Sequence, residues 1–244
     1  MLIREGNERN QSIDLRLAGL LSLVAGALNA AGFELAGLFS ANMTGNISAM
    51  ADNLAKGGWG AALLFGLVVV VFILGALVAG LLIEAGRQRG KRRIYAAVVA
   101  MEAVILILTG LAALAGLTGG DGVGIICMLA GVLGMQNAVS TRISRARVRT
   151  THVSGMATDV GLSLAGLCMR SEESARYRSL LALHCTTISA FLVGGVLGVV
   201  LHRLAGPVTF LCCGLLLALI ALPEMLRRSG LMLLVADPVR ACRC

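Results

Sequence analysis

The polar stretch at residues 41–52, A-N-M-T-G-N-I-S-A-M-A-D, places amides, hydroxyls and a carboxylate in a chain that is otherwise strongly apolar. A second stretch at residues 150–159, T-T-H-V-S-G-M-A-T-D, has the same character in the other half of the chain. Polar groups and glycines are costly at membrane depth unless they face protein, water or a ligand. The two stretches therefore mark the candidate working centre of the protein.

The two stretches contain the donors and acceptors that a small polar solute needs after it loses its water. Gly45 and Gly155 allow the backbone to unwind and to present its own N–H and C=O groups. Broken helices that meet within a membrane bind solutes and ions with such groups. The predicted solute or ion path contains Asn29, Asn42, Thr44, Gly45, Asn46, Asp52, Asn137, Ser154, Gly155, Thr158 and Asp159. The alternative is that these groups only hydrogen-bond neighbouring segments to each other.

Three titratable residues are candidates for coupling the path to protons or cations. Asp159 lies inside the second polar stretch, and Glu102 interrupts a long apolar run. A carboxylate within a bilayer can carry a proton or pair with a cation. His152 could relay protons, although a histidine beside an arginine-rich loop is also typical of a membrane surface.

The sequence does not indicate an enzyme. Ser154 follows His152 by two positions, so on a helix the two side chains point away from each other. Neither G-x-S-x-G nor H-E-x-x-H occurs, and there is no Walker loop. The terminal C-R-C has no third or fourth metal ligand nearby. We therefore expect no catalytic residue, no cofactor and no metal.

Composition identifies an integral membrane protein. Hydrophobic residues make up 57% of the 244, charged residues only 14%, and the mean hydropathy is +0.87. Six clear apolar runs, each a predicted membrane span, occupy residues 17–38, 60–83, 95–117, 123–140, 180–201 and 208–222. The net charge of +8 comes with only 4% aromatic residues, which argues against nucleic acid as a partner. The expected partners are the lipid bilayer and a small polar solute or ion.

Two arrangements of these runs compete. Either the polar stretches dip into the membrane and return, which gives six spans, or they cross it, which gives eight. With six spans, all of the 21 Lys and Arg residues except Lys56 and Arg203 lie on the side of the N-terminus. With eight, they divide almost equally between the two sides. Since basic residues gather in cytoplasmic loops, we predict six spans with both termini in the cytoplasm.

The six-span arrangement makes the two halves of the chain oppositely oriented. L-N-A at 28–30 matches Q-N-A at 136–138, and T-G at 44–45 matches S-G at 154–155. We therefore predict an all-α polytopic membrane protein with six transmembrane helices in two inverted three-helix repeats. Each repeat, at about 17–118 and 122–226, contains a short re-entrant or broken polar helix. Residues 1–16 and 227–244 form cytoplasmic tails around a single transmembrane domain, 17–226.

At G-M-Q-N-A, N-M-T-G-N and the N-A-x-G-F of residues 29–33, the chain resembles the YoaK-like family of bacterial multi-pass membrane proteins. The resemblance covers about residues 17–222. It implies an inner (plasma) membrane location and carries no assigned role. The family commonly has His-Met before T-G-N, whereas this chain has Asn42 at the histidine position.

Two functions are consistent with the sequence. The first is a transporter or channel for a small polar solute, coupled through acids such as Asp159 to protons or cations. The second is a non-transporting membrane scaffold or assembly partner whose polar stretches are structural and whose basic loops bind anionic lipid or protein. A continuous water-lined path would favour the first. Small-residue faces on the second and fifth spans suit either internal packing or a homodimer.

Overall fold

The computed structural model describes residues 1–6, 9–118, 122–170 and 172–226, and within these ranges the chain is helical, with eight α-helices and no strand. Six helices are long and apolar enough to cross a membrane: α1 (Gln11–Ala36), α3 (Trp59–Gln88), α4 (Ile94–Leu114), α5 (Val123–Ser144), α7 (Ser174–Ala205) and α8 (Val208–Leu226). The prediction of an all-α, multi-pass chain with six long apolar helices is confirmed. The predicted C-terminal tail, 227–244, lies outside the described residues.

Each long helix extends beyond the apolar run that predicted it at one end or at both. The α1 helix begins at Gln11 rather than at residue 17, and the Asn10 side chain caps it by accepting from the Ile13 N–H at 3.0 Å. It ends at Gly37, which has a φ of 68° and donates to Phe33 O at 2.7 Å. Hydropathy finds only the apolar part of a helix, whereas capping and hydrogen bonding set its ends.

The first polar stretch forms most of the short helix α2 (Met43–Ala55), and the second forms the start of the short helix α6 (Val153–Cys168). They contain 13 and 16 residues, so at 1.5 Å per residue they extend only about 20 and 24 Å. A bilayer core is about 30 Å thick. Neither short helix is long enough to cross it in the manner of the other six.

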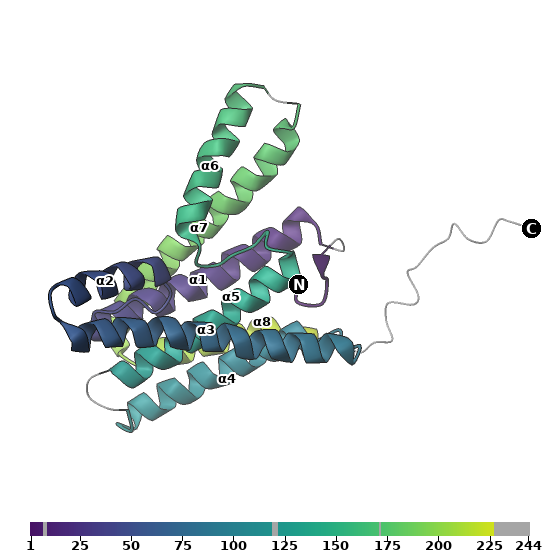
Figure 1. Ribbon diagram of the computed structural model, residues 1–244. Helices are drawn as coiled ribbons and strands as arrows, with labels where there is room; N and C mark the ends of the chain where they lie inside the picture. Colours follow the sequence, from purple (N-terminus) through teal and green to yellow (C-terminus); the bar gives the residue numbers. More distant parts are fainter. Residues whose placement is uncertain (7–8, 119–121, 171, 227–244) are drawn as a thin grey trace, which may run out of the picture.

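The long helices pack in three main pairs, α1 with α7, α3 with α5 and α4 with α8 (Figure 1). The α2 helix packs against α3, and α6 packs against α7. Figure 1 shows α6 and the first part of α7 as a hairpin that projects from the side of the bundle.

Glycines set the closest of these contacts. A Cβ built on Gly26 of α1 would lie 2.0 Å from the carbonyl oxygen of Phe191 on α7. A Cβ on Gly134 of α5 would lie 2.1 Å from the carbonyl oxygen of Phe72 on α3. At both places only a hydrogen atom fits between the two backbones, as small residues permit in membrane bundles.

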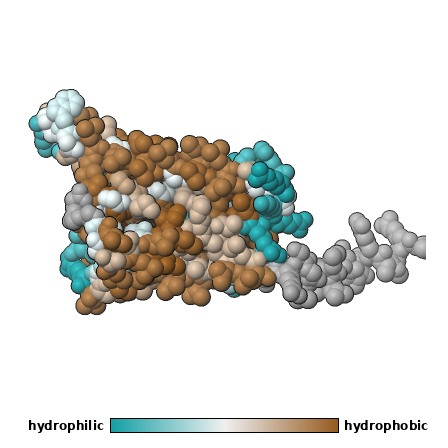
Figure 2. Space-filling view, turned by 90° about the horizontal axis from the view of Figure 1, so that it is seen from below, coloured by the Kyte–Doolittle hydropathy of each residue, from teal (hydrophilic) through white to brown (hydrophobic). Residues whose placement is uncertain are grey.

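The outer surface of the bundle is apolar in its middle. Large hydrophobic side chains of α3 and α7 are exposed, among them Leu63, Ile73, Leu81, Leu192 and Val196. Figure 2 shows hydrophobic residues covering the middle of one face, with hydrophilic residues at the right-hand end and in smaller groups at the left-hand end. An apolar belt of this kind is the surface that a lipid bilayer would cover.

Candidate functional site

A cavity of about 720 Å³ lies where the short helices α2 and α6 begin. Helices α1, α3, α5 and α7 complete its wall. The cavity is lined by Asn29, Phe39, Ala41, Asn42, Met43, Thr44, Phe72, Asn137, Thr151, His152, Val153, Ser154, Ile188, Phe191 and Leu192. Both polar stretches therefore contribute their first residues to one cavity, and within the part of the chain that the structure describes no Asp, Glu, Lys or Arg lines it.

The start of α2 is held by side-chain amides. Asn42 caps the helix by accepting from the Gly45 N–H at 3.0 Å. Just before it, the Ala41 N–H donates to Asn29 Oδ1 on α1 at 2.8 Å. Asn46 is buried and donates through Nδ2 to Phe39 O at 2.9 Å. These bonds fix the segment that turns from α1 into α2.

The start of α6 is held in a similar way. Asn137 of α5 donates through Nδ2 to Thr151 Oγ1 at 2.8 Å, and Thr150 Oγ1 donates to Asn137 Oδ1 at 3.3 Å. His152 occupies the N-cap position, but its side chain makes no capping hydrogen bond. The first turn of α6 consequently leaves the Val153, Ser154 and Gly155 N–H groups outside the helix's own hydrogen bonds.

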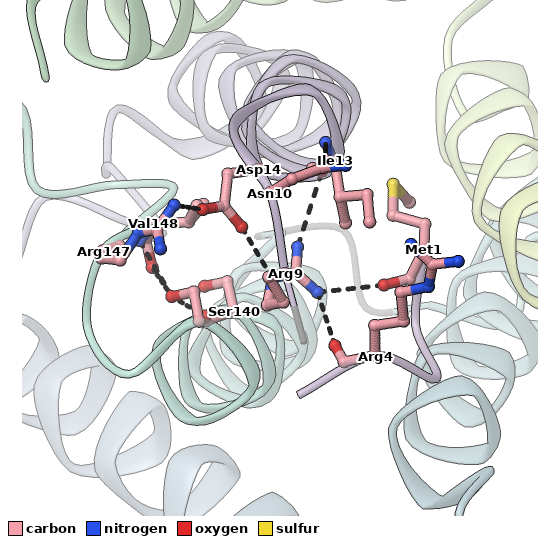
Figure 3. Close-up of polar contacts among 10 residues, drawn as sticks. Met1, Arg4, Arg9, Asn10, Ile13, Asp14, Ser140, Arg147 and Val148 are labelled. Carbon is pink, nitrogen blue, oxygen red and sulfur yellow. Dashed lines mark hydrogen bonds and ion pairs between the residues drawn. The ribbon is translucent and has the colours of Figure 1, made fainter. Parts of the chain in front are cut away.

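A buried ion pair holds the loop that leads from α5 to α6. Asp14 is 1% exposed and accepts from Arg9 Nε at 2.6 Å, and it also pairs with Arg147 of that loop (Figure 3). The Arg9 guanidinium also donates to Met1 O at 3.0 Å and Arg4 O at 2.9 Å. The N-terminal segment thus anchors the loop that positions His152, a role that the sequence did not indicate.

A second cavity, of about 1020 Å³, lies beside the first. It shares Phe72 and Asn137 with the first cavity and extends to Glu84 and Arg142 at the ends of α3 and α5. These two charged side chains pair at 2.8 Å. The two cavities therefore meet at these shared side chains.

Six of the sequence-predicted residues lie together in the wall of the first cavity. They are Asn29, Asn42, Thr44, Asn137, His152 and Ser154. The first four come from α1, α2 and α5, and the last two come from the start of α6. Residues far apart in the sequence thus meet at one place.

The remaining predicted path residues lie outside that wall. Gly45 and Asn46 stabilise the first turn of α2, and Gly155 packs against the His152 ring. Thr158 Oγ1 donates to Ser154 O at 3.3 Å, within its own helix.

The three predicted acids do not line the cavity either. Asp52 is exposed and pairs with Lys56 at 2.7 Å. The Asp159 carboxylate is 55% exposed and lies 3.8 Å from His184 Nδ1 on α7. Glu102 is fully buried in α4, and neither of its carboxylate oxygens has a hydrogen-bond partner among the described residues.

Aromatic residues complete the wall and were not predicted from the sequence. Phe39, Phe72 and Phe191 each come from an apolar run or its edge, where aromatic side chains are ordinary. No local signal in the sequence distinguishes these three phenylalanines from the other apolar residues of their runs. Within the described ranges no group of three or more His, Cys, Asp or Glu side chains could hold a metal ion.

Comparison with known proteins agrees with this description of the chain. No curated protein and no solved structure matches it. Residues 17–222, which include every residue that lines the cavity, match the family described as "Protein of unknown function (DUF1275)". The match covers the same residues as the YoaK-like resemblance and is consistent with it. Because it extends over most of the 244 residues, the chain belongs to this DUF1275 family.

Proposed function

We propose that the protein is a membrane transporter or channel for a small polar solute, and that the cavity between the starts of α2 and α6 is its binding site. The observation that carries the proposal is that both polar stretches open into this one cavity. Polar donors and acceptors gathered at one place among apolar helices are typical of a solute path. The proposed location is the inner (plasma) membrane, with both termini in the cytoplasm.

Helix packing supports an inverted repeat in which α1 to α4 correspond to α5 to α8. The pair α1–α7 then corresponds to α5–α3, and α2–α3 corresponds to α6–α7. In the pairs α4–α8 and α1–α5, each helix packs against its own counterpart. Within α4 and α8, Gly110 lies against Leu211 and Gly214 lies against Ala103 and Ile107, so these two matching helices run in opposite directions. Opposed directions are what an inverted repeat requires.

Single contacts follow the same correspondence. Gly26 approaches the Phe191 carbonyl, and its counterpart Gly134 approaches Phe72, the counterpart of Phe191. The two predicted asparagines behave alike too, because Asn29 bonds to Ala41 and Asn137 bonds to Thr151, each directly before a short helix.

The cavity wall is paired in the same way, which supports a site on the axis between the halves. Asn29 and its counterpart Asn137 both line the cavity, and so do Thr44 and its counterpart Ser154. Asn42 has His152 as its counterpart, so the two N-cap positions differ in chemistry. In transporters built from inverted repeats, the solute site lies at the interface of the repeats.

The second cavity supports a route to the site. It begins among charged residues at the end of α3 and reaches Asn137 and Phe72, which also line the first cavity. A movement of the Phe72 side chain would join the two. A scaffold would need neither cavity nor route.

Cysteine accessibility tests the proposal. In a chain whose seven native cysteines are replaced, Thr44→Cys and Ser154→Cys should react with a membrane-impermeant maleimide in intact and inverted vesicles. Ser22→Cys is the matched control, because Ser22 is fully buried in α1 and should not react.

Failure of both cavity cysteines to react from either side would contradict the proposal. The polar stretches would then be packed without water, and the scaffold function would replace transport. Reaction of Ser22→Cys together with the cavity cysteines would show that the helix bundle had opened, and labelling of the cavity cysteines would then not indicate a water-filled site.

A further inference from the structure

We propose that the cavity selects a small anion, inorganic or carboxylate, over cations and neutral solutes. This inference rests on the proposed function, since it names the class of solute that the same site takes. It departs from the sequence-based expectation that acids couple the path to protons or cations, because none of those acids lines the cavity.

The first reason is the direction of the two short helices. The N-cap residues of α2 and α6, Asn42 and His152, both line the cavity, so both helices begin there and run away from it. The start of a helix carries a partial positive charge and unpaired N–H groups. Two helix starts that converge on one cavity supply these donors from opposite halves of the protein.

The second reason is an amide donor, on a largely buried side chain, that the protein leaves unused. Asn29 is 6% exposed, and its Oδ1 accepts from the Ala41 N–H at 2.8 Å. Its amide nitrogen has no hydrogen-bond partner among the described residues, and Asn29 lines the cavity. We infer that this N–H₂ group points into the cavity. An acceptor bound in the cavity would satisfy this donor.

The third reason is the charge along the route. Among the described residues no carboxylate lines the first cavity, so a cation would have no charged partner from them there. The second cavity, which shares Phe72 and Asn137 with the first, is lined by Arg87, Arg142 and Arg145 against two glutamates. Clefts lined by an excess of one charge raise the local concentration of the opposite ion.

Thermal unfolding of the purified full-length chain in detergent tests the inference. The midpoint is followed while sodium chloride, sodium nitrate or sodium acetate replaces sodium gluconate at constant ionic strength. Chloride and nitrate represent the inorganic class, and acetate represents carboxylates. A ligand that binds only the folded state should raise the midpoint by a few degrees for each tenfold rise in concentration above its Kd.

Two matched variants locate the effect. Ser154→Glu places a carboxylate in the cavity wall, and we expect it to abolish the rise. Thr158→Glu adds the same charge one turn further along α6, outside the wall, and should retain the rise. If Ser154→Glu does not fold, Thr44→Glu with Ser48→Glu as its control tests the same point on α2.

Three outcomes would overturn the inference. The first is that no anion raises the unfolding midpoint, and the second is that the rise is equal in the two α6 variants. The third is that potassium, methylammonium or glycerol gives a saturable rise while the anions do not. In the last case the anion assignment fails and the proposed function stands, provided that the cavity cysteines react. If the cavity cysteines do not react, the result contradicts the proposed function as well as the choice of anion.

Discussion

Replacing Gly26 by alanine should force α1 and α7 apart. The new Cβ would lie 2.0 Å from the carbonyl oxygen of Phe191, while real Cβ atoms essentially never come within 3.0 Å of another heavy atom. The obstacle is backbone, which cannot rotate away as a side chain can. The two helices must therefore separate by about 1 Å or more along their contact.

The cost follows from that separation. Overpacking of a close contact costs about 1–3 kcal/mol, and the loss of contacts on both sides of the glycine adds to it. Alanine stabilises a helix by up to about 1 kcal/mol relative to glycine, which offsets part of this loss. We expect a net loss of about 2 kcal/mol, which lowers the unfolding midpoint of a chain of this size by roughly 4–8 °C.

The assay is thermal unfolding of purified Gly26→Ala in detergent, compared with Gly134→Ala and Gly80→Ala. Gly134 should cost the same as Gly26, because its Cβ would lie 2.1 Å from the Phe72 carbonyl oxygen. Gly80 has no atom within 4 Å of its Cβ position and should keep or slightly raise the midpoint. A Gly26→Ala midpoint equal to that of Gly80→Ala would refute the packing argument. A large loss at Gly26 with none at Gly134 would refute the equivalence of the two halves.

Two further predictions concern the ion pairs and the aromatic partition. Asp14→Ala leaves the buried Arg9 without its carboxylate and should cost about 3–5 kcal/mol in unfolding free energy. Glu34→Gln, which breaks the exposed pair with Arg203, should lower the unfolding midpoint far less, and equal losses would contradict the buried role of Asp14. Phe72→Ala should join the two cavities. A maleimide added on the side of the second cavity should then react faster with a cysteine in the first cavity. An unchanged rate would show that Phe72 does not separate them.

The membrane class and the number of long helices follow from local composition. An apolar run such as 60–83 must be covered by lipid or protein wherever it lies, so hydropathy alone indicates a span. The basic residues between the runs discriminate six spans from eight, because those in each loop indicate the side of the membrane on which that loop lies. The two polar stretches stand out for the same reason, since each is exceptional within its own neighbourhood.

The composition of the cavity depended on tertiary structure. Thr44 and Ser154 line it while Thr158 and Asp159 do not, because the first turn of each short helix faces the cavity and later turns leave it. No local pattern distinguishes these positions, since all four are polar residues in polar stretches. Their separation depends on the angle at which α2 and α6 leave the bundle.

Sequence by itself determined that this chain is a multi-pass helical protein with two polar centres, because hydropathy and charge are properties of single segments. Only tertiary structure decided that the two centres meet, that Phe72 and Phe191 enclose them, and that Arg9 and Asp14 anchor the loop before α6. These contacts join residues from separate helices. Those helices approach closely at glycines such as Gly26. Contact between two backbones does not change the hydropathy of either helix, so hydropathy does not reveal it.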